Sequence, residues 1–447
     1  MTLAIPQARI AAPELPSVVG AELTVPLVDG RRVPYANLDH AASAPCLRAV
    51  RDAVDELLPW YASVHRGAGF ASRVSTEVYE RARDVVRRFV GARRTDTVIF
   101  TRNTTDALNL LARALPRGTS VVHFDTDHHA ALLPWRGPRV RRIASVAELD
   151  AALRDCPTGP RLVVVTGASN VTGEVWPVAD VAAIARHHGA RIVLDAAQLA
   201  PHRPVDVRAL DVDYVVLSGH KLYAPFGAGA LVGRADWLRA ADPYLAGGGA
   251  TTLVADRGSH LAVSWATGPE RHEAGTPNVV GAHALAAACE TLGGHWDAVL
   301  AHERALLDRL RTGLAGVPGL RELSLLGGDR VGVVSFAVDG QDPGLLAAVL
   351  SAEHGIGVRD GAFCAHIATR RLLADAGASG TRALRASLGL ASTAEHVDRL
   401  VAGLSALVTG GPAATYAQVD GRWAPTPDPR PLPPFLSTAL SSTLSTA

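Results

Sequence analysis

Six short, continuously apolar segments constrain the fold of this 447-residue chain more than any other feature of its sequence. Each is rich in Val, Leu or Ile, and helical segments such as VADVAAIARHHG separate several of them. Strands that are apolar on both faces and alternate with helices are typical of a mostly parallel sheet that helices cover on both sides. We therefore expect an α/β fold. The segments are DTVIFT, VVHF, RLVVVTG, RIVLDAA, DYVVLSG and GALVG.

The pattern changes near residue 285, and we divide the chain into four regions. Residues 1–34 contain five prolines and predict an extended N-terminal lead-in. Residues 35–290 carry the apolar strands and form the predicted large domain. Residues 291–409 combine long helices with the strands GVVSFAV and ALRASLGL, which predicts a smaller α+β domain. Residues 410–447 are Pro-rich and then Ser/Thr-rich, and we expect this tail to be partly disordered.

Charge and cysteine usage exclude several classes of protein. The formal net charge is +1, so no general field draws the chain to nucleic acid or to anionic membranes. We find no apolar run of roughly 18 residues and no basic region followed by an apolar one at the start, so neither a membrane span nor a secretory signal is expected. The four cysteines form no CxxC pair, which favours free thiols in a reducing compartment and a cytoplasmic location.

Lys221, in the segment SGHKLYAPFG, is the only lysine of the chain. A GC-rich coding sequence explains why arginine supplies every other long cation on solvated surfaces, where either residue serves. It does not explain the one lysine that is kept. Arginine cannot lose its proton near neutral pH, whereas lysine can. The single lysine therefore indicates a position where a neutral amine is useful.

Polar residues follow the apolar strands, and ligands in open α/β sheets bind at the carboxyl ends of the strands. Thr104 and Thr105 come after DTVIF at the start of a helix, where free N–H groups and the helix dipole favour an anion. An ordinary Thr N-cap is the alternative interpretation. Asp195 ends RIVLD, where a carboxylate needs a partner or solvent. It could also simply cap the next helix.

Two further strand ends carry groups with possible chemistry. Ser218 and His220 follow DYVVL and can donate hydrogen bonds to a phosphate, while partial desolvation would lower the pKa of Lys221 and make its amine a nucleophile. A solvated loop lysine is the alternative. His128 and His129 follow VVHF; adjacent histidines face different ways in regular structure, so we expect no shared metal and one histidine lining a pocket.

These groups together match one cofactor. The strand ends carry an anion cradle, a buried acid, an aromatic ring and an activatable amine. These groups would suit a ligand with a phosphate, a pyridinium nitrogen and an aldehyde. Pyridoxal 5'-phosphate carries all three, and a lysine bonds to its aldehyde while an aspartate keeps its ring nitrogen protonated. The sequence therefore predicts a pyridoxal-phosphate site.

An ordered set of motifs also identifies a family resemblance over roughly residues 35–405. The chain resembles the class V branch of the fold-type I pyridoxal-phosphate enzymes, most closely the SUF-type cysteine desulfurases and selenocysteine lyases. The resemblance implies a large domain with a mostly parallel seven-stranded sheet and a smaller α+β C-terminal domain. The motifs are NLDHAASA, SVHRGAG, YERAR, FTRNTTDALNL, DHHAALLPW, SNVTGEVWPV, VLDAAQLAPH, DYVVLSGHKLYAPFGAGAL, HEAGTPN, GVRDGAFCAH and LRASLGL.

The resemblance implies roles on the cofactor side. Lys221 would bond to the aldehyde, Asp195 would pair with the ring nitrogen, and Gln198 would hydrogen-bond the ring hydroxyl. His128 aligns with the histidine that stacks on the ring. Thr276 in HEAGTPN would reach the phosphate of the neighbouring subunit, which implies a homodimer. The residues that would hold the phosphate within the chain are Thr104, Thr105, Ser218 and His220.

Other matching residues would face the substrate. Arg385 in LRASL would pair with the substrate carboxylate, a bidentate contact for which arginine is suited, and Arg359 is a second candidate. Asn170 would lie near the substrate and the cofactor. His65 and Arg66 in SVHRG would line the entrance from across the dimer.

Cys364 in RDGAFCAH occupies the position of the catalytic cysteine of cysteine desulfurases. There a thiolate takes the sulfur of bound L-cysteine as a persulfide, L-alanine is released, and the sulfur passes to an acceptor protein. A buried structural cysteine is the ordinary alternative, and we assign Cys46, Cys156 and Cys289 to it.

The chain departs from the family pattern at several positions. Ala362 and Phe363 precede the cysteine where two histidines are common, Asn103 stands where the phosphate loop commonly has Gly, and Asp127 replaces a Glu. Two other functions stay open. One is another class V activity, such as that of an aminotransferase, an epimerase or a C–S lyase. The other is a cofactor-binding sensor without turnover.

Overall fold

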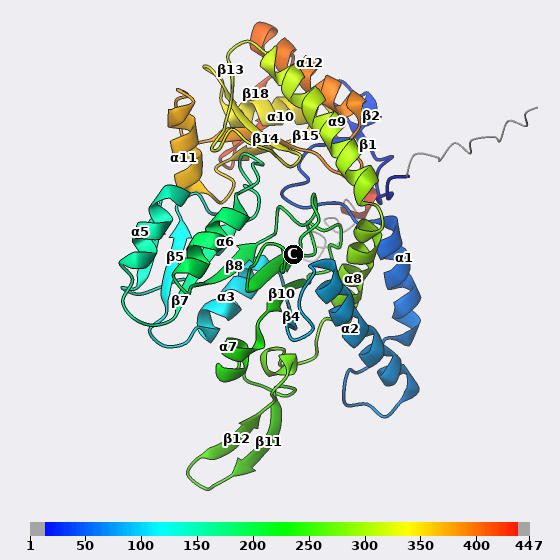
Figure 1. Cartoon of the computed structure of the whole chain (residues 1–447). Coiled ribbons are helices and arrows are strands. Elements are labelled where there is room, and N and C mark those ends of the chain that lie inside the picture. The colour runs from blue at the N-terminus through cyan, green and yellow to red at the C-terminus, as the bar shows by residue number, and fades with distance from the viewer. Residues whose placement is uncertain (1–13, 437–447) are drawn as a thin grey trace, which may run out of the picture.

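The computed structural model describes residues 14–436, and a seven-stranded sheet forms its centre (Figure 1). The strand order is β4-β10-β9-β8-β7-β5-β6, with β10 antiparallel to both of its neighbours and the pairs from β9 to β6 parallel. This confirms the predicted mostly parallel sheet. The strands are β4 (Thr97–Thr101), β5 (Ser120–Phe124), β6 (Val140–Ile143), β7 (Arg161–Thr166), β8 (Arg191–Asp195), β9 (Tyr214–Ser218) and β10 (Gly229–Gly233).

Both faces of this sheet are buried along β5 and β7 to β10, which explains why these strands are largely apolar. The edge strand β6 has the sequence VRRI and is mostly half-buried or exposed. Along β7, Leu162 and Val164 belong to the cluster on one face, and Val163 and Val165 belong to the cluster on the other. Successive side chains of a strand point to opposite faces, so each face needs its own apolar cover. One cover contains α3 (Thr104–Ala114), α4 (His129–Leu132) and α7 (Ala235–Ala240); the other contains α1 (Arg48–Leu57), α2 (Phe70–Phe89), α5 (Leu149–Arg154), α6 (Val178–His187) and α8 (Val279–Gly293).

Two serines in the first turns of α2 hold the segment that precedes this helix. The helix begins at Phe70 after Gly69, and the hydroxyls of Ser72 and Ser75 lie inside the helix. They donate to the backbone oxygens of Ser63 (2.6 Å) and Trp60 (3.1 Å), so they tie down the preceding segment rather than cap the helix. The helix ends just before Gly91, whose φ of 60° lies in the left-handed region.

The C-terminal part of the chain forms a second, antiparallel sheet with the order β13-β14-β17-β16 (Figure 1). The strands are β13 (Leu320–Glu322), β14 (Val333–Val338), β16 (Arg359–Gly361) and β17 (Ala383–Ser387). One face packs on α9 (Trp296–Ala315), α10 (Pro343–His354) and α12 (Ala394–Gly410), and the other packs on α11 (His366–Asp375). Helices beside an antiparallel sheet are the expected α+β arrangement.

The N-terminal segment is folded onto this second sheet. The antiparallel strands β1 (Thr24–Pro26) and β2 (Arg32–Pro34) lie within the predicted lead-in. The strand β3 (Ala36–Asn37) then pairs with β15 (Ile356–Gly357), and Ala36 and Leu38 join the core of the small sheet. Residues 1–13 lie outside the described part of the chain.

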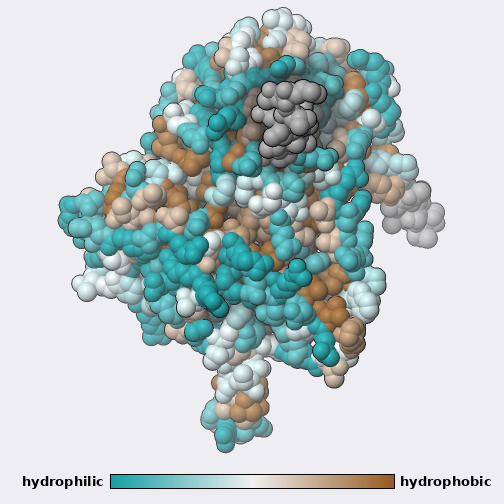
Figure 2. Space-filling view, turned by 45° about the vertical axis from the view of Figure 1, so that its right-hand side comes forward, coloured by the Kyte–Doolittle hydropathy of each residue, from teal (hydrophilic) through white to brown (hydrophobic). Residues whose placement is uncertain are grey.

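Two hairpins were not anticipated from the sequence. In the predicted tail, β18 (Tyr416–Val419) pairs with β19 (Arg422–Pro425), whereas residues 437–447 lie outside the described part. The strands β11 (Thr251–Asp256) and β12 (Leu261–Trp265) form a hairpin that projects from the body, and Figure 2 shows apolar side chains on it. Short 3₁₀ turns are Leu58–Trp60, Val146–Glu148 and Pro269–His272. Within residues 14–436 no helix is long and apolar enough to cross a membrane.

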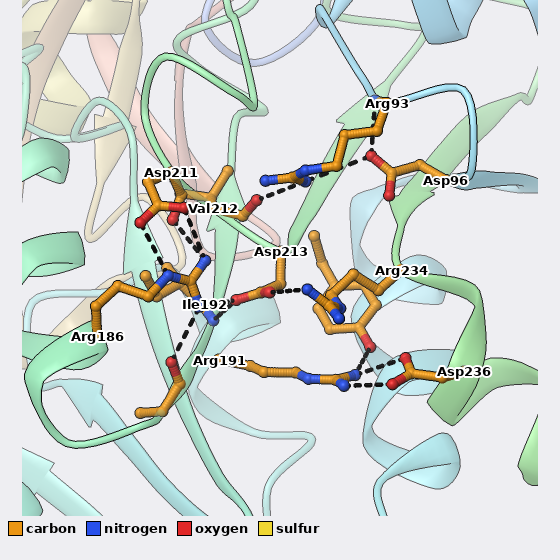
Figure 3. Close-up of polar contacts among 12 residues, drawn as sticks. Arg93, Asp96, Arg186, Arg191, Ile192, Asp211, Val212, Asp213, Arg234 and Asp236 are labelled. Atoms are coloured by element: carbon orange, nitrogen blue, oxygen red, sulfur yellow. Dashed lines mark hydrogen bonds and ion pairs between the residues drawn. The ribbon is translucent and has the colours of Figure 1, made fainter.

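A polar network joins the amino-terminal ends of β8 and β9 to α6 (Figure 3). It lies at the edge of the sheet opposite the carboxyl ends of these strands. Asp213 is buried and accepts hydrogen bonds from the Ile192 N–H (2.9 Å) and from Nη1 of Arg186 (2.8 Å). Arg186 also pairs with Asp211, whose side chain is 57% exposed. The same arginine therefore has one buried and one solvated carboxylate partner.

We expect these two carboxylates to differ in their contribution to stability. Asp213→Asn removes a buried charge partner and should lower the free energy of unfolding by about 2–3 kcal/mol. Asp211→Asn is the matched control, since it removes the exposed partner of Arg186 and should cost less than about 1 kcal/mol. Urea denaturation of the two variants tests this difference. Equal losses would show that burial of Asp213 adds nothing.

Candidate active site

A cavity of about 210 Å³ lies where β7, β8 and β9 end. It brings together twelve of the fifteen residues that the sequence analysis assigned to the site. The carboxyl ends of the sheet are thus the location of the candidate site, as the strand pattern predicted. These twelve residues are Thr104, Thr105, His128, Asn170, Asp195, Gln198, Ser218, His220, Lys221, Arg359, Cys364 and Arg385.

Lys221 lies in a tight turn directly after β9. Its backbone N–H donates to the carbonyl oxygen of Ser218 at 3.2 Å. A Cβ at Gly219 would lie 2.5 Å from the carbonyl oxygen of Ala228, so only glycine allows this close turn. Burial lowers the pKa of the Lys221 amine to about 8, although the nearby Asp195 carboxylate opposes this shift. A sizeable fraction of this amine is therefore neutral near pH 8.

Asp195 is the last residue of β8 and is buried. One of its oxygens, Oδ1, accepts a hydrogen bond from the Ala197 N–H at 3.0 Å, so the alternative of a local cap is partly realised. The residue also lines the cavity. Burial raises the pKa of this carboxyl, because nonpolar surroundings disfavour the charged form. A cation bound beside it would favour ionisation again.

Gln198 follows in the next turn. Its Nε2 donates to the carbonyl oxygen of Ala41 at 2.7 Å, which joins the end of β8 to the N-terminal segment.

The two histidines after β5 face different ways. His128 caps α4, because its Nδ1 accepts the Ala130 N–H at 3.0 Å, and it lines the cavity. Burial, with the positive charge of Lys221 nearby, lowers the pKa of His128 to about 3, so its ring is neutral. The ring of His129 lies 4.7 Å from that of His366 and does not line the cavity. His128 is therefore the one that lines the pocket.

The start of α3 forms the other end of the cavity. The alternative of a Thr N-cap is wrong, because Asn103 is the cap and its side chain accepts the Asp106 N–H at 3.0 Å. The Thr104 N–H donates to Ser218 Oγ at 2.9 Å, and that hydroxyl donates to Thr104 Oγ1 at 3.0 Å. Threonine hydroxyls at this helix start are thus not used for capping and are placed where an anion would be held.

Arg385 enters the cavity from the small sheet and is 2% exposed. Its Nη1 donates to the carbonyl oxygen of Asn170 at 2.9 Å, and its Nη2 pairs with Asp39 Oδ1 at 3.0 Å. Asp39 Oδ2 lies 3.8 Å from Nη1 of Arg359. The Nε of Arg385 has no partner among residues 14–436. A buried guanidinium that lines a cavity and keeps a donor without a partner suits a carboxylate ligand.

Asp39 is a site residue that sequence reasoning missed. It lies in NLDHAASA, a segment that carried the family resemblance but to which no role was given. The signal available was a carboxylate in a short apolar run, which needs a partner. Its two partners come from β16 and β17, more than 300 positions away along the chain, so the pairing could not be seen locally.

Cys364 is the one exposed cysteine among the described residues, whereas Cys156 and Cys289 are buried and Cys46 is half-buried. It sits in a loop between β16 and α11 with φ of 53°. Its carbonyl oxygen accepts the His129 N–H at 2.8 Å, which anchors the loop to the large domain. The thiol thus lies in an accessible loop at the cavity that holds Lys221.

Thr276 and His65 are not brought to this cavity within one chain. Together with Arg66 they line a second pocket, of about 780 Å³. There the Nε2 of His65 lies 2.9 Å from Glu80 Oε1.

The chain matches the family model of the aminotransferase class-V proteins over residues 36–400. It is 38% identical over 391 residues to the cysteine desulfurase of Dickeya dadantii, covering 83% of this chain and 91% of that protein. It is 36% identical over 395 residues to that of Salmonella agona, covering 83% and 93%. Among solved structures, an apo cysteine desulfurase of Thermococcus onnurineus matches with a TM-score of 0.76 and 31% identity over 84% of this chain and 95% of that one.

The pKa of Lys221 can be measured without interference because the chain has one lysine. In ligand-free protein labelled with ¹³C-lysine, the single Cε resonance should titrate near pH 8 instead of near 10.5, the ordinary pKa of a lysine. A midpoint near 10.5 would contradict the burial of this amine.

The same shift predicts how stability depends on pH. Between pH 8 and 10.5 the folded amine is neutral, while the unfolded chain still holds its proton. The unfolded state then binds more protons, so the free energy of unfolding should rise with pH across this window. Lys221→Met should remove this rise, as measured by denaturation of the two proteins at several pH values.

Proposed function

The chain belongs to the aminotransferase class-V family, and on this premise we propose that it is a cysteine desulfurase, which converts L-cysteine to L-alanine and takes the sulfur onto Cys364. The observation that carries the proposal is the shared cavity. An accessible cysteine, a lysine with a lowered pKa and a buried arginine line the same space. These are the groups needed to take sulfur, move a proton and bind a carboxylate.

The family implies pyridoxal phosphate, and the cavity suits it. Thr104, Thr105, Ser218 and His220 surround the start of α3, where a phosphate would be held. Asp195 is a buried carboxyl with a raised pKa, and a cationic ring nitrogen would supply the partner that it lacks. When bound, this cofactor supplies an aldehyde that bonds to amines and a ring that accepts electrons.

The residues of the chain supply binding and proton transfer. Arg385 is placed to pair with the α-carboxylate of the substrate, using donors that Asn170 and Asp39 leave free. The Lys221 amine, partly neutral at pH 8, can take the proton from the substrate Cα and later return one. The neutral ring of His128 can pack against a planar group without repelling a cation.

Cys364 completes the reaction. The Cys364 thiolate attacks the sulfur of the substrate, so an S–S bond forms while the Cβ–S bond of L-cysteine breaks. L-cysteine plus one thiol gives L-alanine plus one persulfide, so atoms and electrons balance without another oxidant or reductant. The electron pair of the broken bond stays with the Cβ and is protonated there. The persulfide would then pass to an acceptor protein.

A second copy of the chain is part of this proposal. His65, Arg66 and Thr276 line the second pocket and do not reach Lys221 within one chain. A partner subunit that brings its own Thr276 to the phosphate and its His65 to the entrance would give these residues a role. The enzyme would then act as a homodimer with two composite sites.

Cys364→Ala should keep the absorbance of the bound cofactor and lower sulfur release from L-cysteine by about a hundredfold or more, because the sulfur then has no nucleophile. Alanine and sulfide formed from L-cysteine are the quantities to measure. Cys46→Ala is the matched control, since Cys46 is half-buried and does not line the cavity. It should keep full activity.

Two outcomes would contradict the proposal. Full desulfuration by Cys364→Ala would exclude Cys364 as the nucleophile. Formation of a keto acid or of an inverted amino acid by the wild-type enzyme, without alanine, would indicate another class V activity instead.

A further inference from the structure

Phe363, the residue directly before Cys364, contacts Arg385 with the face of its ring. Its side chain is 5% exposed and lines the cavity. The guanidinium carbon of Arg385 lies 5.0 Å from the centre of the Phe363 ring, within the range of a cation–π contact. The ring also belongs to the apolar cluster in which α11 packs on the small sheet. Phe363 is therefore fixed on one side by the core and holds the guanidinium on the other.

The backbone of Phe363 is bound to the same arginine through Asn170. The Asn170 Nδ2 donates to the Phe363 carbonyl oxygen at 2.7 Å, and the Asn170 carbonyl oxygen accepts from Arg385 Nη1 at 2.9 Å. The three residues thus form a closed ring of contacts. Phe363 and Cys364 both have positive φ, 52° and 53°, so the loop holds an uncommon conformation that needs such support.

Asp39 holds the guanidinium from a further side, through Nη2. Arg385 has five N–H donors, and two of them are used by Asn170 and Asp39. These contacts restrict rotation of the guanidinium and of its remaining donors. A carboxylate that enters the cavity then meets an arginine that needs little rearrangement.

We propose that Phe363 is a positioning residue that fixes Arg385 for recognition of the substrate α-carboxylate and ties this recognition to the loop of the nucleophile Cys364. The inference rests on the proposed function, because it takes Cys364 as the nucleophile from there. The part that concerns Arg385 and the α-carboxylate applies to any amino-acid substrate. It assigns a role to the apolar residue at a position where the family commonly has histidine: Phe363 attracts a cation with its ring face instead of acting on the thiol.

The test compares two ligands that differ only at the carboxylate. L-alanine and L-alaninamide, which has an amide in place of the carboxylate, are titrated into the holoenzyme, and the cofactor absorbance gives each Kd. The ratio of the two Kd values measures carboxylate recognition alone. Neither ligand contains sulfur, so the result does not depend on the desulfuration step.

Phe363→Leu keeps the apolar volume but removes the ring face. We expect it to lower the preference for L-alanine over L-alaninamide by about three- to thirtyfold, with the Kd of L-alaninamide unchanged. Phe363→Tyr keeps the ring face and should retain the wild-type ratio. In an Arg385→Met background, which has no cation at this position, Phe363→Leu should have no further effect on the ratio.

Two results would overturn the inference. One is a wild-type ratio in Phe363→Leu, which would show that the ring does not position Arg385. The other is an equal loss of affinity for both ligands, which would indicate a general packing role.

Steady-state kinetics on L-cysteine add a second criterion: Phe363→Leu should raise KM more than it lowers kcat. The two ligand-binding results stay the same whether Cys364→Ala loses turnover or keeps it.

Discussion

The burial of the large sheet on both faces is the constraint on which the rest of the structure depends. Helices cover β4 to β10 on both sides, so polar side chains cannot project from the middle of these strands without a cost. They collect where the strands end. Asp195 and Ser218 are the last residues of β8 and β9, and Lys221 follows in the next turn. One end of the sheet thereby becomes a dense, partly desolvated group of reactive side chains.

Desolvation then determines what these side chains can do. It shifts the pKa of Lys221 down to about 8 and that of His128 to about 3, while it raises that of Asp195. An amine, an imidazole and a carboxyl in one cavity are all pushed toward their neutral forms. Burial lowers the pKa of Arg385 as well, but arginine starts from so high a pKa that the guanidinium keeps its charge, and Asp39 and Asn170 hold it. The cavity thus offers a buried positive charge for a carboxylate and an amine for proton transfer.

The sequence predicted the parts of this arrangement that are local. The apolar runs predicted six of the seven strands of the large sheet, but not β6, whose sequence VRRI is not an apolar run. The polar residues after these runs predicted Thr104, Asp195 and Lys221 as cavity residues. The sequence missed what depends on tertiary contacts. The pairing of Asp39 with Arg385 links positions 346 residues apart, and the packing of Phe363 on the same arginine depends on how the loop after β16 lies against β17. The projecting hairpin β11–β12 was missed as well, because its apolar residues are exposed and give no core signal.

The fate of the substrate sulfur is the most direct test of the central claim. Wild-type holoenzyme is mixed with one equivalent of L-cysteine without a reductant or an acceptor, quenched, digested and examined by mass spectrometry. The account predicts one added sulfur atom on the peptide that contains Cys364, and L-alanine in equal amount. Sulfur on a peptide with Cys46, Cys156 or Cys289, or consumption of L-cysteine without alanine, would contradict it.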